Sequence, residues 1–374
     1  VNKWPEPMLS VAAQPLPVET RVGPQRLRVG LTQAIPWLPR LSRQVQAVDA
    51  AAAAARSALD ATLASVRRDV RVPWADLAWM THTASIVKEQ RDLLAGFEPS
   101  VLARLRIGKA TYEDAQRLRL MIGELDENRQ SLLDRTSAAA AMVRAAAGVT
   151  PTQALARAEY EADPLAGREV PDLAQLTAAL RQNPGLVAAE ARIAAARSKV
   201  AATEVRGTPD FAVGLDWIMV GEARMPNVTE SGSDALMVMA SIKIPAWRGA
   251  YAADTDAARA QVDVAKATRE QVLRKAEARL AQLLFELRDA RRKRALYAGD
   301  LVPRARSALT TAMTSYASGR AGFNDLIELE NKLLAYQIRL TTAEASRVRA
   351  VANLELLLGR PLAAVMATSK EKKP

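Results

Sequence analysis

Few side chains in this sequence could perform catalysis. Its 374 residues include one histidine, His82, and no cysteine. A Ser-His-Asp arrangement or a histidine metal site would need His82 in every role, while disulfides, thiolate metal sites and cysteine nucleophiles are excluded. No glycine-rich phosphate-binding loop occurs, and Asp and Glu pairs on helical stretches are too common to indicate acid–base catalysis. We therefore expect neither an enzyme nor a cofactor, and we expect His82 to be a partly exposed helix residue.

Three acidic residues occur at a spacing that repeats along the chain. Asp114 follows Gly108 by six residues, and Asp325 follows Gly319 by the same interval. Glu328 lies three residues beyond Asp325, and the two glycines are 211 residues apart. Because glycine is typical of a turn that ends a helix, each acidic residue is expected shortly after a turn between two helical stretches.

The same offset recurs elsewhere and indicates a duplicated unit. Ile35-Pro36-Trp37 returns as Ile244-Pro245-Ala246-Trp247 at an offset of 209, and Gly148 returns as Gly359 at 211. Each unit contains two short strand-like runs followed by about a hundred residues of helical pattern. In the second unit, residues 172–208 precede the strands, and their counterpart would lie before the first residue. We therefore expect that a further segment, including any export signal, precedes this chain.

Alternation of apolar and polar residues predicts strands in both units. It covers 27–35, 211–219 and 236–244, and it is the pattern of strands with one apolar face. A shorter run, Met8 to Ala13, opens the chain as the fourth strand-like run. Such strands could cover a core, but runs of about ten residues also match tilted membrane-spanning strands. Four strands cannot close a barrel and open edges are not viable in lipid, whereas three copies would supply twelve strands. The membrane interpretation therefore predicts a trimer.

Helical periodicity accounts for most of the remaining sequence. It extends over 40–95, 100–147, 173–205, 248–298 and 304–358. From Leu326 to Ala343, apolar residues alternate at intervals of three and four, which is typical of a coiled-coil seam. A helix of about 55 residues extends roughly 80 Å, so these helices predict a rod or tube rather than a globule.

The composition agrees with packed helices and leaves one alternative open. Hydrophobic residues make up 49% of the chain and aromatic residues 4%, which suits closely packed helices. No run of 18 apolar residues occurs, so no transmembrane helix is indicated. The net charge of +11 could serve nucleic acid or an anionic surface, yet Lys and Arg are spread among Asp and Glu along the helices. The alternative is a soluble basic coiled-coil scaffold or nucleic-acid-binding protein, which would require incidental strands and charge gathered on one face.

The most specific motif of the chain lies in its last third. It comprises Leu301-Val-Pro-Arg-Ala-Arg-Ser-Ala-Leu309, Tyr316-Ala-Ser-Gly319, Phe323-Asn-Asp-Leu-Ile-Glu328 and Leu354-Glu-Leu-Leu-Leu-Gly359. With the duplication, this motif resembles the TolC family of outer-membrane efflux channels over nearly all of 5–362. In that family a trimer forms one twelve-stranded barrel joined to a twelve-helix periplasmic tunnel.

The resemblance implies a fold class and a set of partners. The fold would be mostly α with a small β part, a tandem repeat whose β-hairpins join a trimeric transmembrane barrel and whose long helices form a tunnel. The chain would be a passive duct in the bacterial outer membrane, in contact with its lipid and with no nucleic acid. A periplasmic adaptor protein and an inner-membrane pump would drive export through the homotrimer.

Six segments follow from this assignment. They are a first β-hairpin at 1–39, a first helical hairpin at 40–150, a linker with a returning helix at 151–208, a second β-hairpin at 209–247, a second helical hairpin at 248–362 and a disordered tail at 363–374.

The resemblance also implies a gate at the periplasmic tip. Asp325, Glu328 and Asp114 would each give a ring of three carboxylates in a trimer, and like charges in a narrow aperture favour cations. Tyr316 matches a tyrosine that helps to hold the closed tip by hydrogen bonding. The alternative is that Asp325 and Asp114 are only exposed residues at helix starts.

This sequence departs from the family pattern at three positions near the tip. Ala321 stands where an arginine is expected, Leu105 holds the tyrosine position of the first half, and Arg117 replaces that half's second acid. The turns themselves would dock the adaptor, through Gly108, Lys109, Gly319 and Arg320.

Tryptophans and methionines near the strands suggest contacts in the barrel. Trp37 and Trp247 follow the prolines that end matched strands, where an aromatic girdle would meet the bilayer edge. Trp217 is also assigned to a membrane interface. Ordinary packing is the alternative. Met237 and Met239 share a strand face, and thioethers bind soft Cu(I), so a heavy-metal-specific duct is a further alternative, although methionine is also a flexible packing residue.

Overall fold

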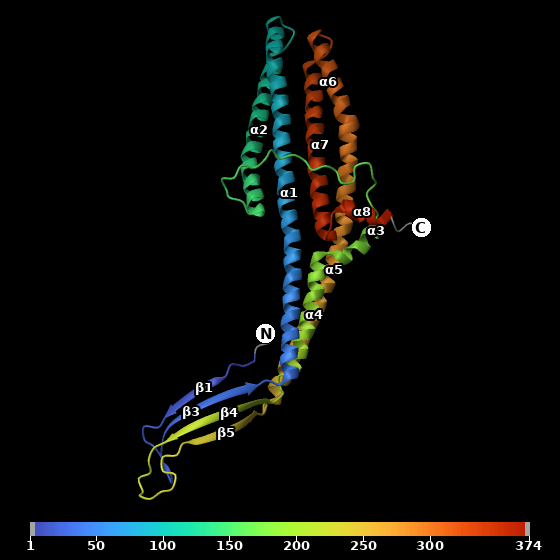
Figure 1. Ribbon diagram of the computed structural model, residues 1–374. Helices are drawn as coiled ribbons and strands as arrows, with labels where there is room; N and C mark the ends of the chain where they lie inside the picture. The colour runs from blue at the N-terminus through green and yellow to red at the C-terminus, as the bar shows by residue number, and fades with distance from the viewer. Residues whose placement is uncertain (1–3, 371–374) are drawn as a thin grey trace. The chain divides into compact units, whose positions relative to one another are not determined.

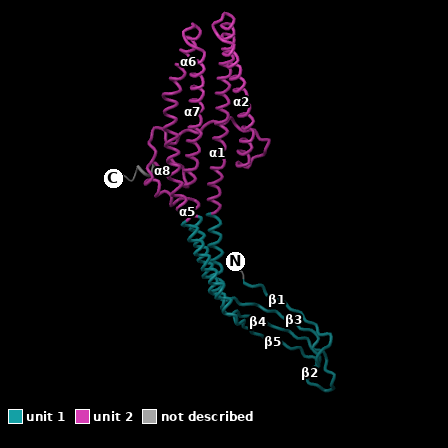
Figure 2. Tube along the Cα trace, turned by 180° about the vertical axis from the view of Figure 1, so that it is seen from behind, with its two compact units in different colours: residues 1–57, 188–270 teal, residues 58–187, 271–374 magenta. Residues whose placement is uncertain are grey.

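The computed structural model describes residues 4–370, most of which are helical. The chain divides into two compact units, unit 1 (1–57 and 188–270) and unit 2 (58–187 and 271–374) (Figure 2). The helices are α1 (Leu38–Arg106), α2 (Tyr112–Ala147), α3 (Leu173–Thr177), α4 (Pro184–Glu204), α5 (Arg248–Leu296), α6 (Val302–Ala317), α7 (Phe323–Leu358) and α8 (Leu362–Lys370) (Figure 1). Within the described range, none of them combines the length and the apolar character needed to cross a bilayer.

Unit 1 contains an antiparallel sheet. Its strands are β1 (Met8–Ala13), β2 (Glu19–Thr20), β3 (Gly23–Ile35), β4 (Asp210–Val220) and β5 (Ala235–Lys243). The order is β1-β3-β4-β5, and β2 pairs with β3. Val29 lies opposite Val11 on one side and Trp217 on the other, so the alternating apolar residues share one face. The three strands predicted from alternation are confirmed, although the first of them begins earlier, at Gly23.

The helical part of unit 1 packs through small side chains. Among its described residues, the buried apolar side chains of α1, α4 and α5 are all alanines: Ala54, Ala188, Ala189, Ala202 and Ala258. Ion pairs of 3.0 Å join α4 to α5, from Arg269 to Glu190 and from Arg259 to Glu204. The abundance of alanine therefore serves close helix packing, as the composition predicts.

Unit 2 is built around two helical hairpins, α1 with α2 and α6 with α7 (Figure 1). One apolar cluster draws on all four helices and includes Val87, Leu94 and Val101 of α1, Leu118 and Leu125 of α2, Leu309 of α6, and Leu326 and Leu333 of α7. A π-helix at Tyr297–Leu301 connects α5 to α6. A second cluster joins α5, α7 and α8 through Leu280, Leu287, Leu354 and Leu362.

A non-helical segment, residues 148–172, crosses α1, α7 and α5 within unit 2 (Figure 1). Arginines from all three helices hold it. Arg71 of α1 pairs with Glu161, and Arg347 of α7 donates to the Glu161 carbonyl. Arg291 of α5 donates to the Leu165 carbonyl at 2.9 Å. Because these donors bind backbone or carboxylate oxygens, the segment satisfies its polar groups without regular structure.

Two expectations about helix ends are wrong. The predicted interruption at 96–99 does not exist, because α1 continues through Pro99. Phe97 and Val101 beside that proline are buried in the hairpin cluster, and this packing outweighs the hydrogen bond that proline removes. The predicted tail at 363–374 begins instead with α8, where Val365 is buried; residues 371–374 lie outside the described range.

Candidate functional site

The first hairpin tip, between α1 and α2, is closed by a capping box. Gly108 has a φ of 69°, the left-handed conformation that glycine adopts without strain. The Thr111 hydroxyl accepts from the Asp114 backbone N–H at 3.1 Å, and Oδ2 of Asp114 accepts from the Thr111 backbone N–H at 2.8 Å. Asp114 therefore fixes the start of α2 and also places a negative charge at its N-terminus.

The second tip, between α6 and α7, repeats this backbone with other side chains. Gly319 has a φ of 79°, and Oδ2 of Asp325 accepts from the Gly322 backbone N–H at 3.2 Å. Glu328 is exposed and pairs with Lys332 one turn later at 2.5 Å. The hydrogen bond from Lys332 lowers the pKa of Glu328 below its ordinary value.

The helix-start role of Asp114 and Asp325 is thus directly visible. It does not compete with a charged aperture, because both caps use Oδ2 of a carboxylate, and a carboxylate has two oxygens that accept hydrogen bonds. Asp325 is exposed and Asp114 is partly exposed. A capping carboxylate at an exposed turn is held in one place, which suits a fixed ring of charge.

Tyr316 is placed differently from the expected latch. It is only 3% exposed, and its ring lies 5.3 Å from that of Phe97 and 6.2 Å from that of Phe323. Its hydroxyl has no hydrogen-bond partner among the described residues, and burial raises the pKa of that hydroxyl. Within one chain, Tyr316 is therefore an aromatic anchor of the hairpin core rather than a hydrogen-bonding latch.

Two arginines of the first hairpin join it to the second, and sequence reasoning missed both contacts. The Arg104 guanidinium lies 4.4 Å from the Tyr316 ring centre and also donates to the Tyr316 carbonyl. Arg117 donates to Oδ1 of Asn324 at 2.6 Å. The resemblance implies an acid at the position of Arg117, so this departure has a structural use. The contacts join residues more than 200 positions apart, and no local pattern could have revealed them.

The four residues predicted to dock an adaptor are all exposed: Gly108, Lys109, Gly319 and Arg320. Arg320 is held at the turn, because its backbone N–H donates to the Ser315 carbonyl at 2.8 Å and its Nε donates to the Ser318 hydroxyl at 3.0 Å. Lys109 and Arg320 therefore place one positive charge at each exposed turn.

The sheet of unit 1 leaves one apolar face uncovered. Exposed residues on this face include Leu9, Val11, Leu31, Phe211, Val213, Leu215, Leu236, Val238 and Ile242. Val238 is 79% exposed. They come from all four long strands and stand in register across the sheet. A continuous apolar face of this kind marks a contact with lipid or protein.

The tryptophans predicted at a membrane interface lie around this sheet. Trp37 and Phe211 have ring centres 6.4 Å apart at the end of the sheet that joins the helices. Trp217 lies toward the other end of β4, where its indole donates to Asp234 at 3.0 Å. Trp247 is 81% exposed. Amphipathic aromatic side chains thus occur at both ends of the apolar face.

The opposite face of the sheet carries an ion pair whose carboxylate is buried. Asp216 of β4 is 2% exposed and pairs with Arg28 of β3. Gly30 makes room for it, because a Cβ there would lie 2.1 Å from Oδ1 of Asp216. Arg28 also lies 3.5 Å from the sulfur of Met239. A positive charge against that thioether disfavours a soft metal cation, so the heavy-metal alternative gains no support here.

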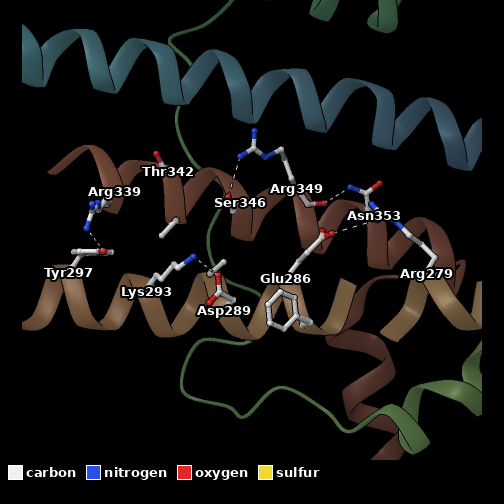
Figure 3. A pocket seen from close by; sticks show the side chains of 13 residues that line it. Arg279, Glu286, Asp289, Lys293, Tyr297, Arg339, Thr342, Ser346, Arg349 and Asn353 are labelled. Carbon is white, nitrogen blue, oxygen red and sulfur yellow. Dashed lines mark hydrogen bonds and ion pairs between the residues drawn. The ribbon is translucent and has the colours of Figure 1, made fainter. Parts of the chain in front are cut away.

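Two further features of the described residues involve polar side chains. His82 is partly exposed, as predicted, and its ring stacks on Tyr160 at 5.0 Å. A groove of about 660 Å³ between α5 and α7 is lined by charged side chains that pair with one another, Lys293 with Asp289 at 2.7 Å and Arg279 with Glu286 at 3.5 Å (Figure 3). Over the described part of the chain, no group of three or more His, Cys, Asp or Glu residues could hold a metal ion.

Comparison with known proteins identifies the fold and a family similarity over part of the sequence. Residues 176–360 match the family model described as outer membrane efflux protein, whereas no curated protein sequence matches significantly. VceC, an outer membrane protein from Vibrio cholerae, superposes with a TM-score of 0.76 at 17% identity, over 95% of this chain and 87% of VceC. The outer-membrane channel OprN gives a TM-score of 0.73 at 20% identity, over 95% of this chain and 80% of OprN.

An open-state structure is also similar. The MtrE outer membrane channel of Neisseria gonorrhoeae gives a TM-score of 0.74 at 15% identity, over 96% of this chain and 82% of MtrE. At these identities the structural likeness establishes the fold, while the family model establishes the sequence relationship over residues 176–360. The chain, mostly helical with one small sheet, therefore has the fold of these outer membrane channels, and its residues 176–360 are similar to the outer membrane efflux protein family.

Proposed function

We propose that the chain is one protomer of a trimeric outer-membrane exit duct. The observation that carries this proposal is the uncovered apolar face of the sheet, which spans β1, β3, β4 and β5. β1 and β5 are its free edges within one chain, and open strand edges are not viable in lipid. Three copies would join β5 of each protomer to β1 of the next and close a barrel of twelve strands, an even number within the known range.

The sheet's two faces suit the two environments of such a barrel. Apolar residues would meet lipid, while Arg28, Asp216 and the small residues Gly30 and Gly214 would line the interior. Trp37 and Trp247 would form one aromatic girdle, and Trp217 would contribute to the other. In this assignment the segments 1–39 and 209–247 supply the barrel, as the two hairpins of a duplicated unit.

The helices would form the periplasmic part of the duct. The segments 40–150 and 248–362 would build the tunnel wall, and 151–208 would brace it. At the tip, rings of Asp114, Asp325 and Glu328 would favour cations, and the exposed turns would contact the hairpins of an adaptor protein. The duct itself would be passive, with an inner-membrane pump providing the driving force.

Planar-bilayer conductance of the detergent-purified protein tests this function. We expect a trimer that gives cation-selective steps, with selectivity weakened in Asp325→Ala and Glu328→Ala because each change removes three charges from the aperture. Glu124→Ala, which alters an exposed acid on α2, is the matched control and should retain wild-type selectivity.

Each outcome separates the parts of the proposal. If both aperture variants conduct with unaltered selectivity, the duct function would be supported, and the assignment of Asp325 and Glu328 to the gate would be contradicted. A protein that stays monomeric and soluble without detergent, and binds nucleic acid in a salt-dependent way, would instead support the basic coiled-coil scaffold.

A further inference from the structure

Glu330 of α7 is a carboxyl group buried without a partner. The residue is 1% exposed, and neither carboxylate oxygen has a hydrogen-bond partner among the described residues. It lies on the face of α7 that carries Leu326, Ile327 and Leu333, all members of the apolar cluster of the hairpins. Buried polar groups nearly always have partners, so an orphaned carboxylate in an apolar core needs an explanation.

The surroundings of Glu330 offer no compensating charge. The hydroxyl groups of Thr83 on α1 and Thr341 on α7 lie 3.3 Å apart. Because the two helices are antiparallel, Leu94, eleven residues after Thr83, lies at the level of Glu330, eleven residues before Thr341. The charged side chains on the neighbouring turns of α1, α6 and α7 are paired elsewhere or exposed: Arg91 pairs with Asp126, Asp92 with Lys88, Glu98 with Arg119, Arg304 with Asp300 and Lys332 with Glu328, and Arg306 is exposed. Burial therefore raises the pKa of Glu330 to about 7, with no other cause contributing.

A second polar group without a partner lies on α1, about one helical turn from the level of Glu330. Gln90 is 4% exposed, and its Nε2 has no hydrogen-bond partner among the described residues. Gln90 is one turn from Leu94 and continues the seam formed by Val87, Leu94 and Val101. An amide donor on α1 and a carboxylate on α7 give entering water the polar partners that it needs in an otherwise apolar layer.

The geometry points to Glu330 as a proton-binding site that controls the separation of the two hairpins. With the proton bound, the carboxyl group is neutral and the hairpins pack around it. When the proton leaves, the carboxylate must be hydrated, because an unpaired charge is too costly to bury. Hydration requires α7 to move away from α1, with Gln90 as the first group to bind the entering water.

The position of Glu330 connects this change to the tip. It lies five residues after Asp325, or about 7.5 Å along α7 at the usual helical rise. A shift of α7 at this level therefore changes the place of Asp325 and the turn at Gly319. The inference deepens the proposed duct function, on which its biological meaning rests: protons on the periplasmic side would favour the packed tip, and their loss would favour the separated one.

Spin-label distances within one chain test the inference directly. The sequence has no cysteine, so Lys109→Cys with Arg320→Cys labels only the two exposed tips. Doubly labelled chains are diluted with unlabelled protein in detergent, so that each distance belongs to one chain. Between pH 5.5 and 8.5 we expect the distance distribution to broaden and shift to longer values, with a midpoint near pH 7.

Variants decide whether Glu330 is responsible. Glu330→Gln keeps the shape without a titrating proton and should reduce the pH-dependent shift at least fivefold, leaving the packed distribution at every pH. Glu124→Gln, an exposed acid on α2, should titrate like the wild type. Tips that do not move with pH in the wild type, or that move equally in Glu330→Gln, would overturn the inference. The spin-label distances can be measured without ion conduction. A protein whose tips move with pH but which conducts no ions would therefore contradict the proposed duct function and still support the role of Glu330.

Discussion

The two hairpin tips of unit 2 have similar backbones and are stabilised differently. Each has a glycine with positive φ, at Gly108 and Gly319, and each has an acid that caps the following helix, at Asp114 and Asp325. The first tip adds a second capping bond from the Thr111 side chain. At the second tip the cap residue is glycine, which has no side chain to contribute.

Aromatic packing replaces that missing bond at the second tip. Tyr316 and Phe323 are buried there, whereas Leu105, at the tyrosine position of the first tip, is only partly buried. Arg104 crosses from the first hairpin to cover the Tyr316 ring. The first tip is therefore held by local hydrogen bonds and the second by a core that the first hairpin helps to build. The two copies of a duplicated hairpin can thus retain the same turn geometry, while the stability of one tip comes to depend on contacts from the other hairpin.

Removing the Tyr316 ring should have the largest effect on this arrangement. Tyr316→Ala leaves a cavity in the hairpin core and should lower the free energy of unfolding by about 3–5 kcal/mol. Leu105→Ala should cost clearly less, because that side chain is partly exposed. Thermal unfolding in detergent, followed by circular dichroism, measures both. Equal losses in the two variants would contradict the asymmetry between the tips.

The Tyr316 hydroxyl provides the control for that comparison. It is buried and has no partner within the described chain, so Tyr316→Phe removes no hydrogen bond and should leave stability unchanged or slightly higher. A loss of more than about 1 kcal/mol, the size of a typical hydrogen bond, would indicate that the hydroxyl is bonded in the assembled protein and would restore its role as a latch.

The buried carboxyl group of Glu330 predicts a pH dependence of the free energy of unfolding that has no counterpart in the first hairpin. Its folded-state pKa of about 7 is above the ordinary value of 4.5, so the folded state holds its proton more tightly than the unfolded state. Stability is therefore greatest below pH 4.5, falls as pH rises to 7, and is flat above that. The full loss is about 3 kcal/mol, since each pKa unit corresponds to about 1.4 kcal/mol.

The first hairpin supplies the matched position for this test. At the offset of the duplication, Glu330 corresponds to Arg119, which is exposed and pairs with Glu98 at 2.7 Å. Glu330→Gln should remove the slope of stability between pH 4.5 and 7, and Arg119→Gln should leave it in place. Chemical denaturation at a series of pH values measures the slope. Its persistence in Glu330→Gln would show that another group titrates.

Sequence patterns predicted the elements well and the contacts between hairpins poorly. Alternation identified the strands, and glycine spacing located both tips, because strand faces and helix-ending turns depend on neighbouring residues. The predicted seam on α7 is confirmed, because Leu326, Leu329 and Leu333 all pack in the hairpin cluster. The buried face also contains Ile327 and Glu330, which the seam omits. A pattern of apolar residues cannot assign a glutamate to a core. Tyr316 and its partner Arg104 were missed as a contact because the fold, and not the local sequence, brings them together.

The smallest effects should come from exchanging the two caps. Thr111→Ala removes one of the two capping bonds of α2 and should cost about 1 kcal/mol. Gly322→Ser would give α7 a side-chain cap, and because glycine is already an acceptable cap residue, the gain should be a few tenths of a kcal/mol. The Gly322 backbone has a φ of −80° and a ψ of 160°, so serine fits there without strain.

The double variant then tests whether the tips differ in kind or only in degree. If the two caps act independently, the effects of Thr111→Ala and Gly322→Ser should add within about 0.5 kcal/mol, as expected for separate sites. Thermal melting of the single and double variants gives this sum. A larger departure would mean that the contact from Arg117 to Asn324, close to both caps, transmits the change from one hairpin to the other. The tips would then act as a single unit, and a gate built on them would open as one.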